Sequence, residues 1–174
     1  MATTTTNNAW SIPTATDLVK NGYSAIATLG SAIDTSVGTG LLAWTAYTPT
    51  WGGFGVGNAT QTWNYAKVGK IVHVRGRVVM GSTSTFAGSL TFSLPATANS
   101  GYVQFQPIGA VYIGDVSASQ PYSGFTFWNS TTTIGMNVGN SAGTYTVPNN
   151  VTSAVPMTWA VSDQIYISFT YEAA

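Results

Sequence analysis

The segment from Lys70 to Met80, KIVHVRGRVVM, restricts the fold more than any other part of the chain. From residue 72 onward its even positions hold valine, valine, glycine, valine and methionine, whereas the odd positions include His73, Arg75 and Arg77. Side chains on a β-strand point alternately to opposite faces. The alternation therefore predicts a strand with one buried face and one polar face.

The closing segment, residues 164–171 (QIYISFTY), alternates in the same way. Further candidate strands lie at residues 60–65, 90–94, 102–116, 122–128, 133–138 and 155–161. Clusters of glycine, proline and asparagine separate them, as turns require, and residues 148–150 (PNN) are one predicted turn. Many short strands at such spacing are typical of an antiparallel β-sandwich or jelly roll, so we expect a mainly β fold over residues 44–174.

A helical pattern precedes this region, at residues 17–38. Residues 14–17 (TATD) place a hydroxyl three residues before a carboxylate, as in a capping box, so we expect one α-helix to begin there. Val19, Ile26 and Ile33 then share one heptad position, and Leu29 shares the other with small residues. We expect glycines at residues 38 and 40 to end the helix.

This helix is weak by intrinsic propensity, because Gly22 and Gly30 each cost about 1 kcal/mol relative to alanine. Packing must therefore hold it, either across the core of the β-domain or against another protein chain. The second reading divides the chain into a polar tail with a docking or oligomerisation helix (residues 1–43) and a β-sandwich head (residues 44–174). The residues expected to dock or oligomerise are Trp10, Leu18, Val19, Ile26, Leu29 and Ile33.

The composition excludes several classes of function. Only five basic and five acidic residues are present, so 6% of the chain is charged, against roughly 25% in a typical soluble domain. We expect no nucleic-acid partner, because nucleic-acid binders cluster Lys and Arg. No cysteine is present. No apolar run approaches the ~20 residues that cross a bilayer, so we expect no membrane insertion. Without a signal-peptide pattern, we expect synthesis in the cytoplasm.

Little catalytic chemistry is available in residues 44–174, where Asp115, Asp163 and Glu172 are the acids and His73 is the histidine. Aspartates near turns usually cap backbone groups. A pair formed by Asp115 and Asp163 would suit a glycosidase, and a glycan-degrading enzyme is therefore one alternative. We otherwise expect a protein that is not an enzyme, with no catalytic residue, no metal site and no cofactor.

Basic and glycine-rich stretches permit weaker interpretations. Arg75 and Arg77, with Lys67 and Lys70 nearby, predict either a solvated face or a layer between subunits. The glycine-containing run at residues 52–57 lacks the Lys-Ser/Thr ending of a phosphate-binding loop, so we expect a flexible loop.

Aromatic residues give the best binding signal, since Trp and Tyr stack on sugar rings. Many of the aromatics alternate along predicted strands and are expected in the core. Four of them are expected in loops, and these are the candidate glycan-binding residues: Trp51, Phe54, Tyr102 and Tyr122.

Four segments together resemble minor tail and fibre proteins of tailed phages that infect actinobacteria. These segments are DLVKNGYSAIATLGSAID (17–34), YTPTW (47–51), GNATQTWNYAKVGKIVHVRGRVVMGSTSTF (57–86) and SDQIYISFTYEAA (162–174). The resemblance implies a virion-docking N-terminal segment, a C1q-like β-sandwich head and a homotrimer at the virion surface. This chain lacks the Gly-X-Y stalk of longer relatives.

The resulting expectation is a trimeric virion fibre or spike. Its N-terminus would attach to a capsid, collar or tail protein, and its head would adhere to host cell-surface glycans. The alternative is a capsid decoration protein or head fibre without a specific receptor.

Overall fold

The computed structural model describes residues 3–5, 9–12, 14, 19–40, 43–140 and 147–174. The chain divides into two compact units, Met1–Ala43 and Trp44–Ala174, at the boundary where the sequence pattern changes. Each unit is described by itself below.

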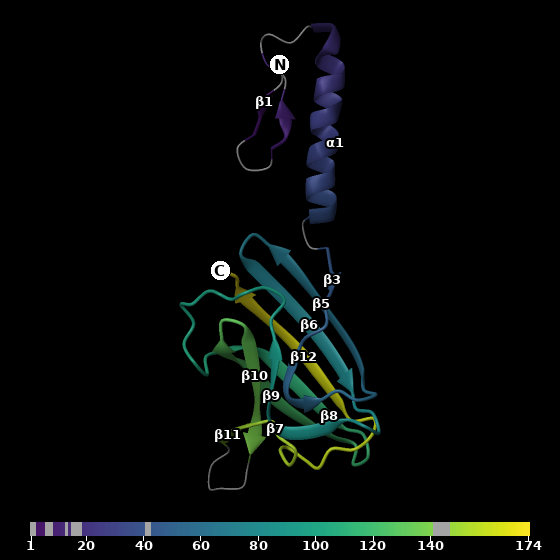
Figure 1. The fold of residues 1–174 in the computed structure, drawn as a ribbon, viewed down its shortest axis with the longest axis vertical. Coiled ribbons are helices and arrows are strands. Elements are labelled where there is room, and N and C mark those ends of the chain that lie inside the picture. Colours follow the sequence, from purple (N-terminus) through teal and green to yellow (C-terminus); the bar gives the residue numbers. More distant parts are fainter. Residues whose placement is uncertain (1–2, 6–8, 13, 15–18, 41–42, 141–146) are drawn as a thin grey trace. The chain divides into compact units, whose positions relative to one another are not determined.

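The first unit consists of a short hairpin and a helix (Figure 1). Strand β1 (Thr3–Thr4) pairs antiparallel with β2 (Ser11–Ile12). Local hydrogen bonds close this hairpin. The backbone N–H of Thr5 donates to the carbonyl of Trp10 at 2.9 Å, and the N–H of Trp10 donates to Oγ1 of Thr5 at 3.0 Å.

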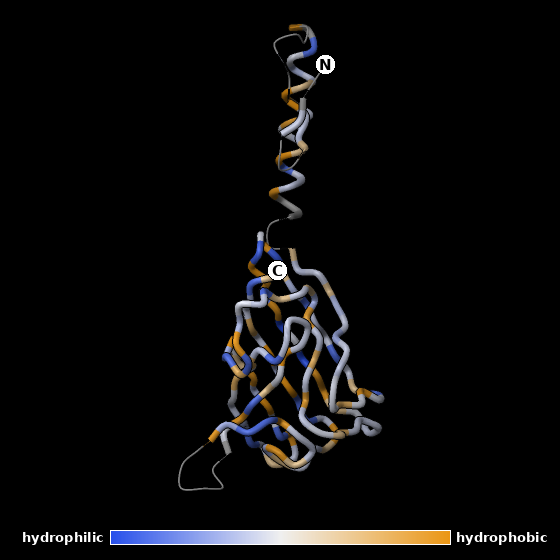
Figure 2. Tube along the Cα trace, turned by 60° about the vertical axis from the view of Figure 1, so that its left-hand side comes forward, coloured by the Kyte–Doolittle hydropathy of each residue, from blue (hydrophilic) through white to orange (hydrophobic). Residues whose placement is uncertain are grey.

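The helix begins with a 3₁₀ turn, η1 (Val19–Asn21), and continues as α1 (Gly22–Gly40). The predicted start of the helix falls mostly on residues 15–18, which lie outside the described residues. The helix reaches Gly40, in agreement with the predicted glycine stop. Figure 2 shows hydrophobic residues recurring along it between polar ones.

The second unit is an antiparallel β-sandwich formed by one curled sheet. The strand order is β3-β5-β6-β12-β8-β9-β10-β7-β4, and β11 pairs with β10 beside β7. The strands are β3 (Thr45–Ala46), β4 (Trp51–Gly55), β5 (Thr60–Val68), β6 (Ile71–Val79), β7 (Thr85–Ser93), β8 (Pro107–Asp115), β9 (Gln120–Ser130), β10 (Thr133–Asn140), β11 (Val147–Asn150) and β12 (Gln164–Glu172). The predicted fold class, mainly β with one N-terminal α-helix, is confirmed for the described residues.

The alternation of β6 and β12 sorts their side chains as predicted. On β6 the valines at 72, 74 and 78 are buried, and His73, Arg75 and Arg77 are exposed. The largest fully buried side chains fill the space enclosed by the sheet: Tyr171, Phe92, Leu90, Ile113, Ile134, Met136, Ile165, Val72, Val74, Val78, Val138 and Val151. The core therefore lies on one face of each long strand, and the other face remains at the surface.

Aromatic side chains join the two ends of the curled sheet. Trp51 on β4 and Trp63 on β5 have ring centroids 5.7 Å apart, and both rings contact Phe92 of β7. The indole N–H groups of Trp51 and Trp63 donate to the same atom, Oε1 of Gln61, at 3.1 and 3.2 Å. The two ends of the sheet are thus linked by ring packing and by shared hydrogen bonding.

The glycine-rich run at residues 52–57 was predicted to be a flexible loop, and this prediction is wrong for its first four residues. Residues 52–55 belong to β4, which pairs with β7. A Cβ atom added at Gly52 would lie 2.4 Å from Oγ1 of Thr91, and one added at Gly53 would lie 2.3 Å from the carbonyl oxygen of Ser89. The glycines therefore serve close strand approach, which the composition alone does not distinguish from flexibility.

Two other predictions for the C-terminal region are corrected. Residues 155–161 were predicted to be a strand, but they form turns and irregular backbone. Pro156 has no N–H to donate to a ladder, and the N–H of Ala160 donates to the side chain of Asp163. Residues 148–150, predicted as a turn, belong to β11, where Pro148 lies on a short strand.

Substitution of Gly76 tests the packing beneath Trp63. Gly76 pairs with Trp63, and a Cβ at Gly76 would lie 2.3 Å from Cε3 of that ring. We expect Gly76→Ala to lower the free energy of unfolding by about 1–3 kcal/mol through overpacking, measured by urea titration. Gly114→Ala on β8 is the control, because nothing lies within 4 Å of its added Cβ. Equal losses in both variants would contradict this account.

Alkaline unfolding tests the burial of Tyr171. Its hydroxyl donates to the carbonyl of Ala96 at 2.8 Å, and burial raises the pKa of Tyr171 to about 12. Burial also raises the pKa of Tyr47. Because unfolded phenols ionise near pH 10, we expect constant stability below about pH 10 and a progressive loss as the pH rises towards 12. Circular dichroism during an alkaline titration measures the loss, and Tyr171→Phe should reduce this pH dependence.

Candidate functional site

The helix of the first unit presents two different faces. One face packs within the unit, where Gly22, Ala25, Leu29 and Ala32 are half-buried and β2 contacts α1. On the same face, Nε1 of Trp10 donates to Oγ of Ser36 at 3.1 Å. Trp10 and Leu29, two of the predicted docking residues, are therefore half-buried within their own unit, and their docking role stays a prediction.

The other face of the helix is apolar and exposed. Its large side chains follow one another at intervals of four and three residues, with Gly30 at the gap: Val19 (96% exposed), Tyr23 (86%), Ile26 (64%), Ile33 (37%) and Val37 (50%). We call these five residues and Gly30 the helix seam. Val19, Ile26 and Ile33 were predicted members, Tyr23 and Val37 are additions, and Leu18 lies outside the described residues. A seam with 4–3 spacing is the pattern that meets another helix in a coiled coil.

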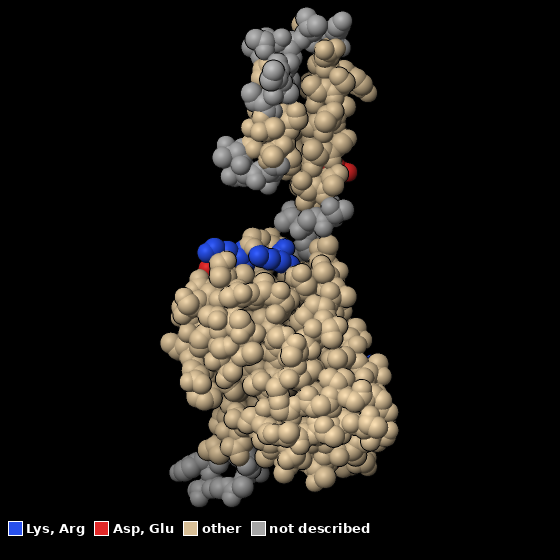
Figure 3. Space-filling model, viewed as in Figure 1, with Lys and Arg blue, Asp and Glu red and all other residues tan. Residues whose placement is uncertain are grey.

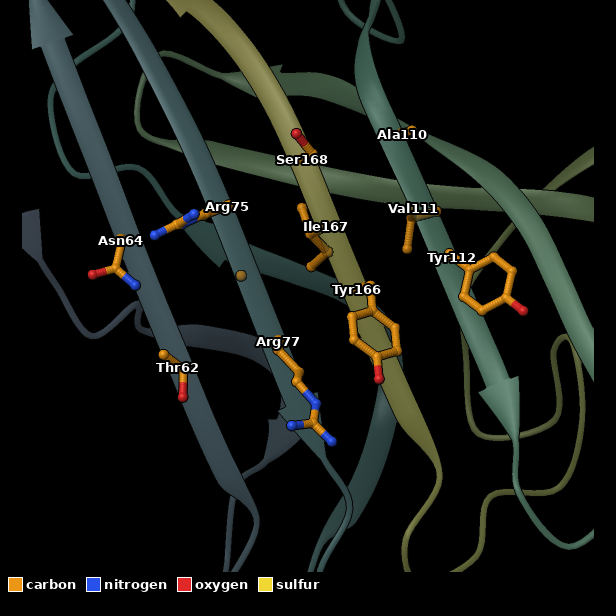
Figure 4. A pocket seen from close by; sticks show the side chains of 11 residues that line it. Thr62, Asn64, Arg75, Arg77, Ala110, Val111, Tyr112, Tyr166, Ile167 and Ser168 are labelled. Atoms are coloured by element: carbon orange, nitrogen blue, oxygen red, sulfur yellow. The ribbon is translucent and has the colours of Figure 1, made fainter. Parts of the chain in front are cut away.

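The second unit carries a groove of about 550 Å³ on the outer face of β5, β6, β12 and β8 (Figure 4). Two adjacent rows of cross-strand neighbours line it. The first row is Asn64, Arg75, Ser168 and Ala110, and the second row is Thr62, Arg77, Tyr166 and Tyr112. The register of four strands therefore brings together residues that are far apart in the sequence.

Differences in side-chain size hollow the groove. Ser168 and Ala110 are small and lie next to each other on neighbouring strands. Tyr166 and Tyr112 stand beside them in the second row, with ring centroids 6.2 Å apart. The small residues form a floor, and the tyrosines form a wall along one side.

Aromatic rings hold both arginines of the groove. The guanidinium carbon of Arg75 lies 4.0 Å from the ring centroid of Trp44, and that of Arg77 lies 5.6 Å from the ring of Tyr166. Gln164 fixes the second pair, because its Oε1 accepts from Nη2 of Arg77 at 3.0 Å and from the hydroxyl of Tyr166. Stacking uses the flat face of a guanidinium and leaves its N–H edge available.

No carboxylate neutralises these arginines in the part of the chain that the structure describes. The ion pair found there joins Nζ of Lys70 and Oε1 of Glu172 at 3.9 Å. His73 lies two residues before Arg75, and its Nδ1 forms a 2.7 Å hydrogen bond with Oγ1 of Thr170. On the face of the β unit seen in Figure 3, basic side chains gather at one end and most of the surface carries no charge.

The four aromatic residues predicted to bind glycans are not brought together. Trp51 and Phe54 lie in β4, so their predicted loop placement is wrong. Tyr122 lies in β9, in agreement with the strand predicted at residues 122–128 and not with its loop placement. Phe54 is only 6% exposed, and Trp51 packs on Trp63 and Phe92. Trp51 and Phe54 were predicted in loops because the glycines around β4 resemble turn signals.

Tyr102 does lie in a loop, beside a second pocket of about 380 Å³. Its hydroxyl accepts from the backbone N–H of Glu172 at 2.7 Å. Nδ2 of Asn99 donates to Oε1 of Glu172 at 3.2 Å, and the side chain of Gln106 also lines the pocket. The loop is thereby fastened to the end of β12.

The two aspartates considered as a catalytic pair each serve a turn. Asp163 is fully buried, and its two oxygens accept from the backbone N–H groups of Val116 and Ala160 at 3.0 and 2.7 Å. Oδ1 of Asp115 accepts from the N–H of Ala118 and the hydroxyl of Ser117, both at 2.8 Å. These hydrogen bonds, led by that from Ala118, lower the pKa of the Asp115 carboxyl.

No protein-family model, curated protein or solved structure matches this chain. Within the described residues, no three His, Asp or Glu side chains lie close enough together to hold a metal ion. Among the described residues, no helix is both long enough and apolar enough to span a bilayer.

Sequence reasoning identified the arginines of the groove but missed Trp44, Tyr112 and Tyr166. A signal for Tyr166 existed, because it alternates with Ile165 and Ile167 and therefore lies on the outer face of its strand. The register across β12 and β8, which pairs Tyr166 with Tyr112, is not readable from either strand alone.

Substitution of Asp163 tests its structural role. An asparagine has one carbonyl oxygen, so Asp163→Asn leaves the N–H of Val116 or of Ala160 facing an NH₂ group. We expect the free energy of unfolding to fall by about 1–3 kcal/mol, measured by urea titration. Asp115→Asn is the matched control, since one oxygen already accepts both of its bonds, and it should leave the midpoint almost unchanged. A stable Asp163→Asn variant would contradict the role.

Proposed function

We propose that this chain is a structural, non-enzymatic virion protein of a tailed phage, a trimeric fibre or spike. In this proposal the first unit associates with its own copies and with a capsid, collar or tail protein. The β-sandwich adheres to glycans on the host surface. The exposed helix seam is the observation that carries the proposal.

The exposure of the seam supports association through the first unit. Burying apolar surface contributes roughly 25 cal/mol per Å², and Val19, Tyr23 and Ile26 are each more than half exposed. Gly22 and Gly30 weaken the helix, and nothing lies within 4 Å of a Cβ added at either glycine. A helix of this kind gains most of its stability when another surface covers the seam.

The identity of the seam residues favours three copies over two. With 4–3 spacing, Val19, Ile26 and Ile33 occupy the d position of the heptad, and Tyr23, Gly30 and Val37 occupy the a position. β-branched residues at d disfavour two-stranded coiled coils and shift the preference to trimers or tetramers. Closed symmetry supplies each seam with an identical partner.

The β unit supports adhesion rather than catalysis. Asp115 and Asp163 are engaged in turns, and the groove combines aromatic rings with hydrogen-bonding side chains. Weak contacts of such a head would be multiplied by three copies in one fibre and by many fibres on one particle. A decoration protein or head fibre without a receptor is the second candidate, favoured by the nearly uncharged face in Figure 3.

Charged substitutions in the seam test the proposal. We expect the full chain to sediment as a trimer, and Ile26→Asp and Ile33→Asp to shift it to monomer because each would bury a carboxylate between helices. Analytical ultracentrifugation measures the mass. Ser31→Asp, at an exposed polar position of the same helix, is the control and should remain trimeric.

The same variants test attachment to the particle. In phage that carry the variant gene, antibodies against the β unit should label wild-type and Ser31→Asp particles and should fail to label Ile26→Asp particles. A monomeric wild-type chain, or Ile26→Asp particles labelled as fully as wild type, would overturn the docking role of the seam.

A further inference from the structure

We propose that the groove on β5, β6, β12 and β8 binds an acidic sugar, with the carboxylate or phosphate groups of the ligand on the face that carries Arg75 and Arg77. The inference deepens the adhesive role proposed above and rests on it. It names both a site and a class of ligand that the aromatic residues alone do not indicate.

Charge is the first reason. Arg75 and Arg77 are alternate residues on one face of β6, so their Cα atoms are about 7 Å apart. No described carboxylate lies within ion-pairing distance of either residue. Two unopposed like charges on one face create a potential that an oxyanion of the ligand would relieve.

The setting of the two guanidinium groups is the second reason. Arg75 stacks on Trp44 at 4.0 Å, and Arg77 is held by Tyr166 and Gln164. In Figure 4, Arg75 extends towards Asn64 while Arg77 lies beside Tyr166. A guanidinium that is stacked in place loses less rotamer entropy when it forms a bidentate contact with a carboxylate or phosphate.

The remaining residues suit a sugar ring. Tyr166 and Tyr112 are 40% and 47% exposed, and the exposed parts of aromatic rings pack against the apolar faces of pyranoses. Thr62, Asn64 and Ser168 place hydroxyl and amide groups along the groove for ligand hydroxyls. Four strands at about 4.8 Å spacing span roughly 14 Å, enough for a short oligosaccharide.

A second copy of this chain is the competing occupant, and charge argues against it. In an assembly that brought the grooves together on its symmetry axis, the same arginines of each copy would approach one another. No described acidic residue lines the groove to compensate them. Burial of unpaired like charges is strongly unfavourable, whereas an anionic ligand supplies the missing charge.

Calorimetric titration of the full chain tests the inference with three probes at about 0.15 M ionic strength. The probes are a hyaluronan hexasaccharide, which carries carboxylates, a phosphorylated mannose oligosaccharide, and neutral cellohexaose. We expect binding of at least one anionic probe and none of cellohexaose. The two anionic probes distinguish a carboxylate ligand from a phosphate ligand.

Variants localise the binding. Arg75→Gln and Arg77→Gln should each weaken binding of the anionic probe about tenfold or more. Lys67→Gln, which removes a basic group outside the groove lining, should leave binding unchanged. Ala110→Trp fills the groove from β8 without changing charge and should also abolish binding. Urea titrations of each variant verify that it is folded.

Three results would overturn the inference: no binding of either anionic probe, equal binding of cellohexaose, or unchanged affinity in both arginine variants. If Arg75→Gln instead strengthens self-association, the groove is a contact between copies and the ligand is excluded. If the seam variants contradict the docking role while the groove still binds an anionic probe, only the proposed virion role is overturned. If the protein is a trimer on the particle but binds neither anionic probe, only the inference about the ligand is overturned.

Discussion

The contact between Trp51 and Trp63, with both indole N–H groups on Gln61, closes the sheet on which every other feature of the β unit depends. A buried tryptophan removes roughly 200 Å² from water, worth about 5 kcal/mol at ~25 cal/mol per Å². The contact joins strands near opposite ends of a ten-stranded sheet. Without it the valine faces of β6 and the isoleucine faces of β12 would lack the opposing layer that buries them.

Closure also fixes which side of each strand is free for function. Gly76 faces inward, where its missing Cβ makes room for the ring of Trp63. Its neighbours Arg75 and Arg77 consequently face outward, onto the same surface as Tyr166. The alternation of side chains along β6 therefore sets both the core packing and the residues of the groove. A shift of one residue in the strand register would exchange the two faces.

The first unit divides its functions in a similar way. Trp10 and the short hairpin cover one face of α1, which accounts for the half-buried Leu29 and the bond to Ser36. That coverage leaves the helix seam exposed. The sequence indicated an apolar helix that needs packing partners. Ile26 and Leu29 lie only about 60° apart around a helix with 3.6 residues per turn. The pattern therefore could not show that Leu29 packs within the unit while Ile26 stays exposed.

Local periodicity in the sequence is enough to predict the alternation of β6 and β12, the mainly β class, the helix ahead of it and the boundary at residue 43. The remaining features depend on contacts between segments that are distant in the chain. The glycines of β4 resemble a loop in the sequence, and only their pairing with β7 shows that they form a strand. Tyr112 and Tyr166 become neighbours only through the register of β8 and β12. Pairing between distant strands has no local signal, so the groove exists only in the folded sheet.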